Sequence, residues 1–396
     1  MAQKYDALIV GGGAAAMVAA ITLGRTGKTT ALLERLERVG KKILQTGNGR
    51  CNVTNKNIGL KNYGSENLPF VKRVLENVPL SETESFFESI GVILAEEKDG
   101  KLFPQSFQAS SVLDLLRLEI NRLGIEEKTN FFVTDIKKSG DTFTVLSESG
   151  EEAMAKSVII ATGGMAAPQM GCDGSGYGLL AKMGHTLISP HPALVQLKIK
   201  NPYRALKGVK QDGEVTLFID GKRQKYATGE FLFTDYGISG PPVFNLSIMA
   251  AKALDEGRRV TVSVNFLPYK EKNEAAQILI GRKENLPHLW GEDFLNGIVN
   301  KRLGKEIMKM SKNISDVIKN TTQFEVEISG TLSYKNAQTT SGGIDTADFN
   351  PDTMESYITP GIFAAGEVLD VVGDCGGYNL QWAWSSGILA GRAAGE

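Results

Sequence analysis

The sequence predicts an α/β fold in which a parallel sheet with helices on both faces is interrupted by a β-rich insertion. Three features of the 396 residues support this prediction. The chain starts with a strand, glycine turn, helix and strand, and it becomes β-rich and then helical with many lysines after Pro190. After Ser341 the glycine-rich style of the first part returns, so one interrupted domain explains the order of segments better than two consecutive domains.

The N-terminal elements are read from short apolar runs. Residues 5–10 and 29–33 are strand candidates, and residues 14–27 between them are rich in alanine and permit a helix. This order predicts one βαβ unit of a parallel sheet. Further along we expect a helix at 110–123 and strands at 128–132, 141–146 and 157–161.

The insertion differs from its flanks in pattern. Its first part alternates like strands and contains the hairpin-type turn Asp220-Gly221, and its middle is helical. The predicted parts of the chain are 1–190, 191–339 and 340–396, and the insertion divides into β-rich 191–267, helical 268–320 and β-rich 321–339.

Composition indicates a globular protein of a reducing compartment. The formal net charge is −1, and the three cysteines lie far apart without a CxxC pair, which argues against a disulfide framework or a zinc site. The apolar run 7–23 is broken by three glycines, so we interpret it as a buried strand and helix and not as a membrane span. We therefore expect a cytoplasmic protein with no bound metal; the oligomeric state stays open.

The first glycine turn carries a dinucleotide-binding pattern. Gly11, Gly13 and Ala16 match G-x-G-x-x-G/A after a strand and before a helix, so the backbone can approach a pyrophosphate at the helix N-terminus. Glu34 ends the next strand and is placed to accept the ribose hydroxyls.

Later segments indicate which dinucleotide binds. ATGG at 161–164 follows a strand, and GIFAAGEVLD at 361–370 ends another with Gly366-Glu367, an acid suited to a ribityl chain. GDCGGYNLQWAWSSG then opens a final helix, whose N-terminal amides would face the flavin ring and stabilise its reduced form. These elements favour FAD over a simple NAD site.

Several motifs together resemble the bacterial BaiN/RdsA-type FAD-dependent oxidoreductases. They are KKILQTGNGRCNVTN, GKLFPQSFQASSV, ATGG with GSGYGLLAKMGH, PALVQL, FLFTDYGISGPPV and AAGEVLDVVGDCGGYNLQWAWSSG. The resemblance implies a Rossmann-like FAD-binding domain interrupted by a β-barrel insertion that carries a helical subdomain. Activities in the family differ: reduction of uracil to dihydrouridine in ribosomal RNA, reduction of conjugated double bonds in 3-oxo bile acids, and oxidation of aminoacetone.

Motifs and resemblance together predict the cofactor site. The residues expected to bind FAD are Gly11, Gly13, Ala14, Ala15, Glu34, Arg35, Lys42, Gly47, Asn48, Gly49, Val133, Ala161, Thr162, Gly163, Gly366, Glu367, Gly377, Tyr378, Asn379 and Leu380. Lys42 is expected to neutralise the pyrophosphate. NAD(P)H is the expected electron donor, and it would dock without a second G-x-G-x-x-G.

Cys51 lies in the polar loop at 39–55 and is the candidate catalytic residue. Its thiol would protonate the carbon of a reduced C=C bond, and the alternative is a small packing residue beside the cofactor. Lys41, Lys42 and Arg50 lie nearby in sequence, so we expect a moderately acidic thiol.

The substrate that the sequence and the resemblance favour is a uracil in ribosomal RNA. The insertion 191–339 has 22 Lys+Arg against 16 Asp+Glu, and the remainder has 22 against 29. An ordinary scatter of surface charges explains this difference in net charge as well as contact with a polyanion does. The residues predicted to contact RNA are Lys207, Lys210, Lys222 and Arg223. A small-molecule ene-reductase, an amine oxidase and a flavin-bound RNA-binding or sensor protein without turnover are the alternatives.

Two positions depart from the family pattern. Asp235 stands where the family usually has histidine in FTH-x-G-x-SGP, and Tyr357 stands where a lysine commonly follows TMES. If that histidine takes part in substrate chemistry in relatives, their activity does not transfer to this chain.

Overall fold

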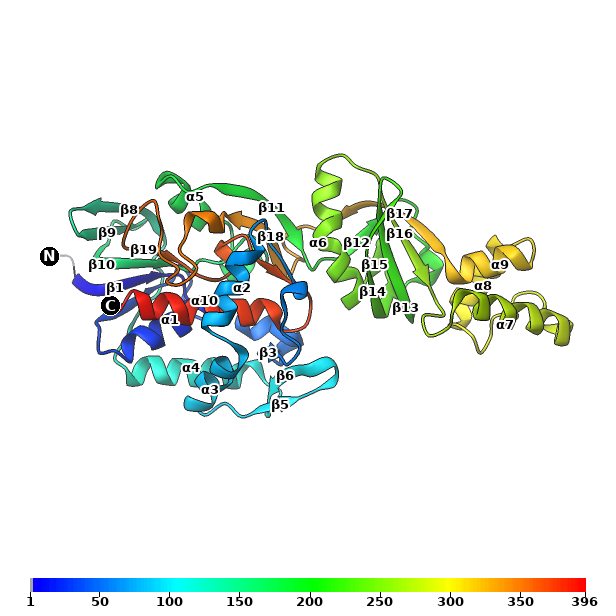
Figure 1. Ribbon diagram of the computed structural model, residues 1–396, viewed down its shortest axis with the longest axis horizontal. Helices are drawn as coiled ribbons and strands as arrows, with labels where there is room; N and C mark the ends of the chain where they lie inside the picture. The colour runs from blue at the N-terminus through cyan, green and yellow to red at the C-terminus, as the bar shows by residue number, and fades with distance from the viewer. Residues whose placement is uncertain (1–2) are drawn as a thin grey trace. The chain divides into compact units, whose positions relative to one another are not determined.

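The structure, a computed structural model, describes residues 3–396 and divides into two compact units. The first unit holds the residues up to Pro190 together with Thr339–Glu396, and the second is His191–Gln338 (Figure 1). Within residues 3–396, no helix combines the length and apolar character needed to cross a membrane.

The first unit is built on a seven-stranded sheet with a parallel centre. β1 pairs in parallel with β2 on one side and β10 on the other, and β7 and β19 extend the parallel part. Val10 is in register with both Leu33 and Ile160, so three strands end at one edge, where ligands bind in such folds. The strands are β7 (Glu126–Lys128), β2 (Thr30–Leu33), β1 (Gln3–Val10), β10 (Glu152–Ile160), β9 (Thr142–Ser147), β8 (Val133–Ser139) and β19 (Ile362–Ala364).

Two helices far apart in sequence pack together beside this sheet. They are α1 (Ala14–Gly24) and α10 (Tyr378–Ala393), and they lie side by side in Figure 1. A Cβ atom at Gly387 would lie 2.4 Å from the carbonyl oxygen of Ala15, and one at Gly391 would lie 2.5 Å from that of Ala19. Glycine at these two positions therefore permits the close approach that joins the last helix to the first.

The remaining elements of the first unit surround this core. The helices are α2 (Leu68–Asn77), α3 (Leu80–Ser89), α4 (Ala109–Arg122) and α5 (Ser175–Lys182). Three small sheets pair β3 (Thr54–Asn55), β6 (Lys101–Pro104) and β5 (Leu94–Glu96); β20 (Val372–Gly373) and β4 (Tyr63–Gly64); and β11 (Leu187–Ala193) and β18 (Thr339–Ile344).

The second unit contains a closed antiparallel barrel with a helical part. Asp220 and Gly221 have φ values of 50° and 76°, as a two-residue hairpin turn of the primed type requires. The barrel order is β12 (Leu197–Ile199), β15 (Gly237–Ser239), β14 (Lys222–Phe233), β13 (Lys210–Ile219), β16 (Val260–Asn265) and β17 (Phe324–Thr331). The helices are α6 (Pro241–Asp255), α7 (Lys272–Asn285), α8 (Lys301–Met310) and α9 (Ile314–Thr322). The predicted fold class is confirmed.

One predicted strand is wrong. The segment 128–132 is not a strand, because β7 ends at Lys128 and the chain turns at Asn130, whose φ is 56°. The N–H groups of Asn130 and Phe131 donate to the carbonyl oxygens of Leu36 and Glu34. This turn brings aromatic residues to the carboxyl end of β2, where they contribute to the site described next.

Candidate functional site

The turn after β1 leaves room for a phosphate group. Gly11 has a φ of +109°, and a Cβ there would lie 2.5 Å from the carbonyl oxygen of Ala161, so only glycine fits. At Gly13, a Cβ would meet no atom of residues 3–396 within 4 Å. No side chain of the described residues caps the N-terminus of α1, where Ala14 and Ala15 lie, so its N–H groups are available to an anion.

Glu34 lies where a ribose acid is expected. Its side chain is buried, and Oε1 accepts a hydrogen bond of 2.8 Å from the N–H of Leu36. Burial raises the pKa of the carboxyl group, and the N–H groups of Leu36 and Gly12 oppose this effect. A carboxylate has about four acceptor positions, so acceptor capacity remains for the hydroxyls of a ribose.

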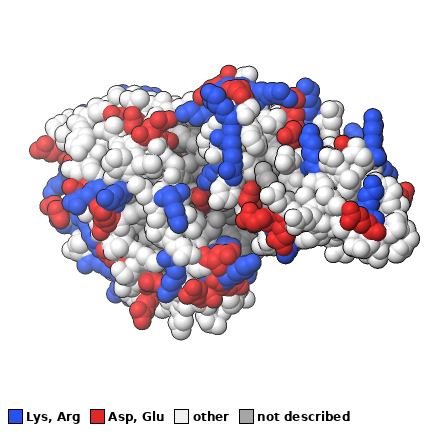
Figure 2. Space-filling model, turned by 45° about the vertical axis from the view of Figure 1, so that its right-hand side comes forward, with Lys and Arg blue, Asp and Glu red and all other residues white. Residues whose placement is uncertain are grey.

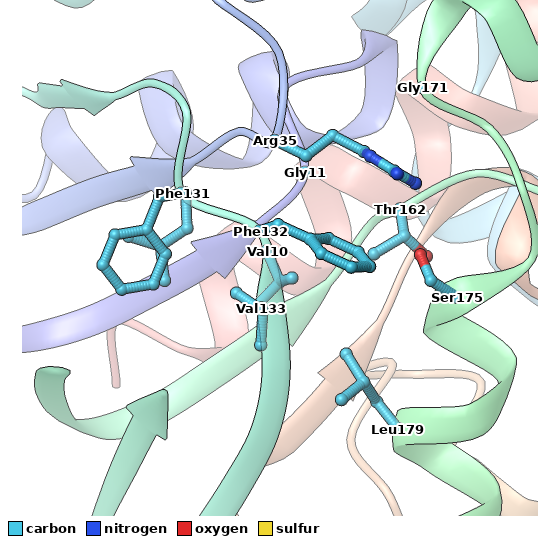
Figure 3. Close-up of a pocket in the computed structure, with 11 residues that line it drawn as sticks. Val10, Gly11, Arg35, Phe131, Phe132, Val133, Thr162, Gly171, Ser175 and Leu179 are labelled. Carbon is cyan, nitrogen blue, oxygen red and sulfur yellow. The ribbon is translucent and has the colours of Figure 1, made fainter. Parts of the chain in front are cut away.

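A pocket opens at the carboxyl edge of the sheet (Figure 3). Its empty volume is about 330 Å³ when the space open to solvent is included. The guanidinium carbon of Arg35 lies 4.3 Å from the ring centre of Phe132, and Arg35 also pairs with Asp173. The lining residues are Val10, Gly11, Leu33, Arg35, Phe131, Phe132, Val133, Thr162, Gly171, Ser175 and Leu179. Four predicted residues, Gly11, Arg35, Val133 and Thr162, meet here, beside Glu34 and the α1 N-terminus.

Lys42 and Glu367 meet each other. Lys42 Nζ lies 2.7 Å from Glu367 Oε2, and Glu367 Oε1 accepts a hydrogen bond of 3.0 Å from the N–H of Thr340. Burial is the largest single effect and lowers the pKa of the Lys42 ammonium group, but the Glu367 carboxylate and Cys172 together outweigh burial, so the pKa is raised. The positive charge expected at the pyrophosphate is therefore balanced by the acid expected at the ribityl chain.

Thr340 is a residue that the sequence did not reveal. Its hydroxyl accepts hydrogen bonds from the N–H groups of Met165 and Ala166, at 2.8 and 3.0 Å. A Cβ at Gly164 would lie 2.5 Å from the same hydroxyl and 2.9 Å from Glu367 Oε1. Thr340 thus joins Glu367 to the loop after Ala161, Thr162 and Gly163, and no local motif signals this role.

The N-terminus of α10 is open and firmly held. Among the described residues no side chain caps it, and its first turn has no acid. Gly377 has a φ of +101°, and a Cβ there would lie 2.6 Å from the carbonyl oxygen of Thr54. The Asn379 carboxamide donates to and accepts from the backbone of Gly373, both at 2.8 Å, so the side chain is used within the loop. Gly377, Tyr378, Asn379 and Leu380 stay predicted cofactor contacts, Asn379 through its backbone N–H group and not through its side chain.

The two tryptophans of α10 support the surrounding loops. The ring N–H of Trp382 donates to the carbonyl oxygen of Gly366 at 3.0 Å, and that of Trp384 donates to the carbonyl oxygen of Val53 at 2.8 Å. Both rings are buried. These two hydrogen bonds hold the segment before Glu367 and the segment after Cys51 close to the N-terminal part of α10.

Four of the five residues of the loop Gly47–Cys51 have a left-handed backbone. Gly47, Asn48, Gly49 and Cys51 have φ values of 57°, 56°, 83° and 57°. Cys51 is 0% exposed and belongs to the main core. Its sulfur is out of reach of a substrate in this conformation, which supports the packing interpretation.

The expectation of a moderately acidic Cys51 thiol is wrong. Burial raises its pKa to about 11, and the hydrogen bond with Thr46 opposes this only in part. The cations adjacent in sequence have other partners: Lys41 pairs with Glu37, Lys42 with Glu367, and Arg50 with Glu97. Proximity in sequence did not place these charges at the sulfur.

The basic residues proposed for RNA lie at two places. Lys207 pairs with Asp235 at 2.8 Å and Lys210 with Glu230 at 3.0 Å. Lys222 and Arg223 lie at the other end of the β13–β14 hairpin, roughly 30 Å away at 3.3 Å per strand residue. Figure 2 shows acidic and basic side chains interspersed on the face that it draws.

The two departures from the family pattern are both at exposed positions. Asp235, where the family has histidine, pairs with Lys207 and its side chain is about half exposed, at 54%. Tyr357 is 62% exposed.

The features of the first unit fit FAD. The open space at Gly13 and the N-terminus of α1, which no side chain of the described residues caps, suit a pyrophosphate. The buried acid Glu34 at the end of β2 suits a ribose. The N-terminus of α10, likewise uncapped within the described residues, suits a flavin ring. The residues that would hold it come from both parts of the interrupted unit.

Comparison with known proteins agrees with this site. The family model described as HI0933-like protein Rossmann domain matches residues 5–393. The chain is 40% identical to a 3-dehydro-bile acid delta(4,6)-reductase of Clostridium scindens over 98% of each chain. It is 31% identical to a ribosomal RNA dihydrouridine synthase of Haemophilus influenzae, covering 98% of this chain and 97% of that one.

A solved structure adds a likeness in fold. The 3-ketosteroid delta1-dehydrogenase from Sterolibacterium denitrificans aligns over 99% of both chains with a TM-score of 0.55 and 12% identity. Because the family model and the two relatives cover nearly the whole chain, the chain belongs to the HI0933-like Rossmann family, and the predicted class of FAD-dependent oxidoreductase is confirmed.

Proposed function

We propose that this protein reduces a C=C bond conjugated to a carbonyl group in a small ring-shaped molecule of the 3-oxo steroid or bile-acid type. The names of both relatives describe reduction of a ring C=C bond, and the identity of 40% to the bile-acid reductase supports the small-molecule substrate. The structural observation that supports a redox function is the N-terminus of α10, which follows Gly376 and Gly377. No side chain of residues 3–396 caps this N-terminus. An open helix N-terminus stabilises negative charge of the kind that a reduced flavin carries.

Each part of the candidate site has a task in this proposal. The α1 N-terminus binds the pyrophosphate, Glu34 accepts the ribose hydroxyls, and Glu367, held by Lys42, faces the ribityl chain. When bound and reduced by NAD(P)H, FAD would supply the hydride for one carbon of the C=C bond, and a proton from solvent would complete the reduction at the other carbon. NAD(P)H is the proposed source of electrons; the sequence has one glycine fingerprint, so the donor would dock transiently at the site that the substrate later occupies.

The preference for RNA is weaker than the sequence alone suggested. This preference rested on the basic residues of the insertion. Lys207 and Lys210 form ion pairs, and they lie at the opposite end of the β13–β14 hairpin from Lys222 and Arg223. Uridine in ribosomal RNA remains the second candidate, supported by the net positive charge of residues 191–339 and by the 31% identical relative.

Separate tests distinguish the two candidates. Pre-reduced, oxygen-free holoenzyme should reduce a 3-oxo-4-ene steroid, with recovery of the oxidised flavin spectrum and a saturated product in the mass spectrum. Mass spectrometry of ribosomal RNA from cells with and without the gene should show equal dihydrouridine. A loss of dihydrouridine without the gene, with no steroid turnover, would replace the proposal by the RNA function.

Charge reversal tests the RNA surface further. Because the basic residues lie at two ends of the hairpin, Lys207→Glu with Lys210→Glu and Lys222→Glu with Arg223→Glu should be made as separate pairs. An RNA surface would lose affinity in at least one pair, with a smaller salt dependence and flavin still bound.

A further inference from the structure

Asp173 joins two walls of the pocket shown in Figure 3. Its carboxylate forms an ion pair with Arg35, whose side chain extends from the end of β2 over the ring of Phe132. Gly171 and Ser175, two positions before and after Asp173, line the same pocket from the loop that leads into α5. The side chains of Arg35 and Asp173 are 30% and 37% exposed, so the ion pair lies on the solvent side of the pocket.

The Asp173 carboxylate is charged and has two donors. Its Oδ2 accepts a hydrogen bond from Nη1 of Arg35, and its Oδ1 accepts one of 3.1 Å from the N–H of Ser175. Burial is the largest single effect and raises the pKa of Asp173, but Arg35 and Ser175 together outweigh burial, so the pKa is lowered. The two ends of the loop are joined by a hydrogen bond of 3.1 Å from the N–H of Gly174 to the carbonyl oxygen of Gly164. Breaking the ion pair would therefore release the loop from Arg35 while the two ends of the loop stay joined.

The group that fits this pocket is the adenine ring of FAD. Glu34, the acid expected to bind the ribose of the adenosine half, directly precedes Arg35 in the chain, so a base attached to that ribose lies beside the pocket. The apolar side chains of Leu33, Phe131 and Leu179 line it and suit a planar ring. A guanidinium group stacks on aromatic faces, and Arg35 already does so with a ring of the protein.

We propose that the Arg35–Asp173 ion pair closes the pocket over the adenine ring of bound FAD and thereby slows release of the cofactor. When the pair is formed, the loop and the end of β2 are held together at the solvent side of the pocket. When the pair breaks, this side opens and the adenine ring leaves. The proposal rests on the FAD site of the proposed function and adds control of cofactor exchange to it. Asp173 is a positioning residue here, because it acts through Arg35.

Asp173→Asn should speed the release of FAD from the holoenzyme. The variant keeps the size of the side chain and removes the charge, so the pair weakens and the release rate should rise by about three- to tenfold. The measurement is the increase of FAD fluorescence after dilution of the loaded protein. Asp173→Glu keeps the carboxylate and should return the release rate to within twofold of the starting protein. Loss of a merely structural contact would not be rescued by the charge alone.

Salt provides a second readout that needs no variant. Because the pair is partly exposed, salt screens it, so release from the starting protein should accelerate between about 0.05 and 1 M salt. The release rate of Asp173→Asn should change less over the same range. A release rate of the starting protein that does not rise with salt would contradict the proposal, even if Asp173→Asn does not fold.

The double variant shows whether Asp173 acts through Arg35. Arg35→Met removes the other partner, so adding Asp173→Asn to it should change the release rate by less than a further twofold. Asp352→Asn is the matched control, since it breaks an ion pair of 2.6 Å with Arg73 in the same unit, and neither residue is among those that line the pocket. This control should release FAD within twofold of the starting protein.

Two results would overturn the proposal. One is a release rate of Asp173→Asn within twofold of the starting protein. The other is an equal acceleration by Asp173→Asn in the starting protein and in Arg35→Met, which would mean that the carboxylate does not act through the guanidinium. All these rates are measured on FAD-loaded protein without a substrate, so a failure to reduce a steroid would contradict the proposed function and not the role of the ion pair.

Discussion

Lys42 and Glu367 are 325 positions apart in the sequence and form an ion pair of 2.7 Å between Nζ and Oε2 in the interrupted unit. Lys42 follows the first βαβ unit, and Glu367 follows the β19 strand after the insertion. The pair therefore joins the two parts of the cofactor domain at the place where the cofactor is expected. The side chains of Lys42 and Glu367 are only 23% and 20% exposed, so each charge needs the other to offset the cost of its removal from water.

Lys42→Met should destabilise the protein by about 1–3 kcal/mol, because the Glu367 carboxylate loses its counter-charge. Adding Glu367→Gln should recover part of this loss. Urea denaturation of the two single variants and the double variant gives the coupling energy of the pair. Strictly additive losses would mean that the two side chains do not depend on each other.

Gly13→Leu should abolish FAD binding while the apoprotein keeps its stability. A side chain at this position points into open space in the protein but into the path of the pyrophosphate. Flavin content after purification and the melting temperature of the apoprotein are the two measurements.

Gly11→Leu is the contrasting variant, because its Cβ meets the Ala161 backbone and its φ is +109°. It should lose stability and flavin together. If Gly13→Leu retains full flavin content, the phosphate site is elsewhere.

Cys51→Ala should reduce substrate at nearly the normal rate. The thiol is 0% exposed and, with a pKa of about 11, stays protonated at every pH used for assays near neutrality. We expect a loss of about 1–2 kcal/mol of stability from the smaller side chain, and less than a threefold change in the reduction step. A drop of about 100-fold in that step, with normal flavin reduction, would restore Cys51 as the general acid.

Acid should weaken the protein through Glu119. Its hydrogen bond from Arg122, with a further contribution from Arg25, lowers the pKa of the carboxyl group to about 2 despite burial. Because the folded pKa lies below the ordinary value of 4.5, the stabilisation is complete above pH 4.5 and is lost as the pH falls toward 2. Arg122 is 65% exposed, so screening reduces the contribution to about 1–3 kcal/mol.

Glu119→Gln tests this pH dependence. The variant should be less stable than the starting protein at pH 7, and the two free energies of unfolding should converge near pH 2. The Glu127 side chain is 19% exposed against 9% for Glu119, so Glu127→Gln, which breaks the pair with Arg117, should change stability by less than about 0.5 kcal/mol. A constant difference between pH 7 and pH 2 would contradict the role of Glu119.

The sequence was informative where function depends on local pattern. The glycine turn at Gly11 and Gly13, the acid Glu34 and the hairpin turn at Asp220-Gly221 each require a residue type at a fixed spacing, and these elements formed as predicted. The segment 128–132 was predicted as a strand because of its aromatic residues. These residues instead lie in a turn and line a pocket, and apolar character alone does not distinguish these two cases.

What the sequence could not provide was pairing over distance. The Lys42–Glu367 pair and the hydroxyl of Thr340 depend on segments brought together by the fold. The same limitation explains the errors on charge. Cations beside Cys51 in sequence pair elsewhere, and the basic residues of the insertion, close in sequence, lie at opposite ends of a hairpin.

The most direct test of the central claim is a single turnover of the reduced holoenzyme without oxygen. The protein is purified with its FAD, reduced, and mixed with a 3-oxo-4-ene steroid while the flavin spectrum and the steroid products are followed. The account predicts that the flavin is reoxidised in step with formation of the saturated ketone, one equivalent for each bound FAD. A flavin that stays reduced with the steroid and is reoxidised only when oxygen is admitted would contradict it.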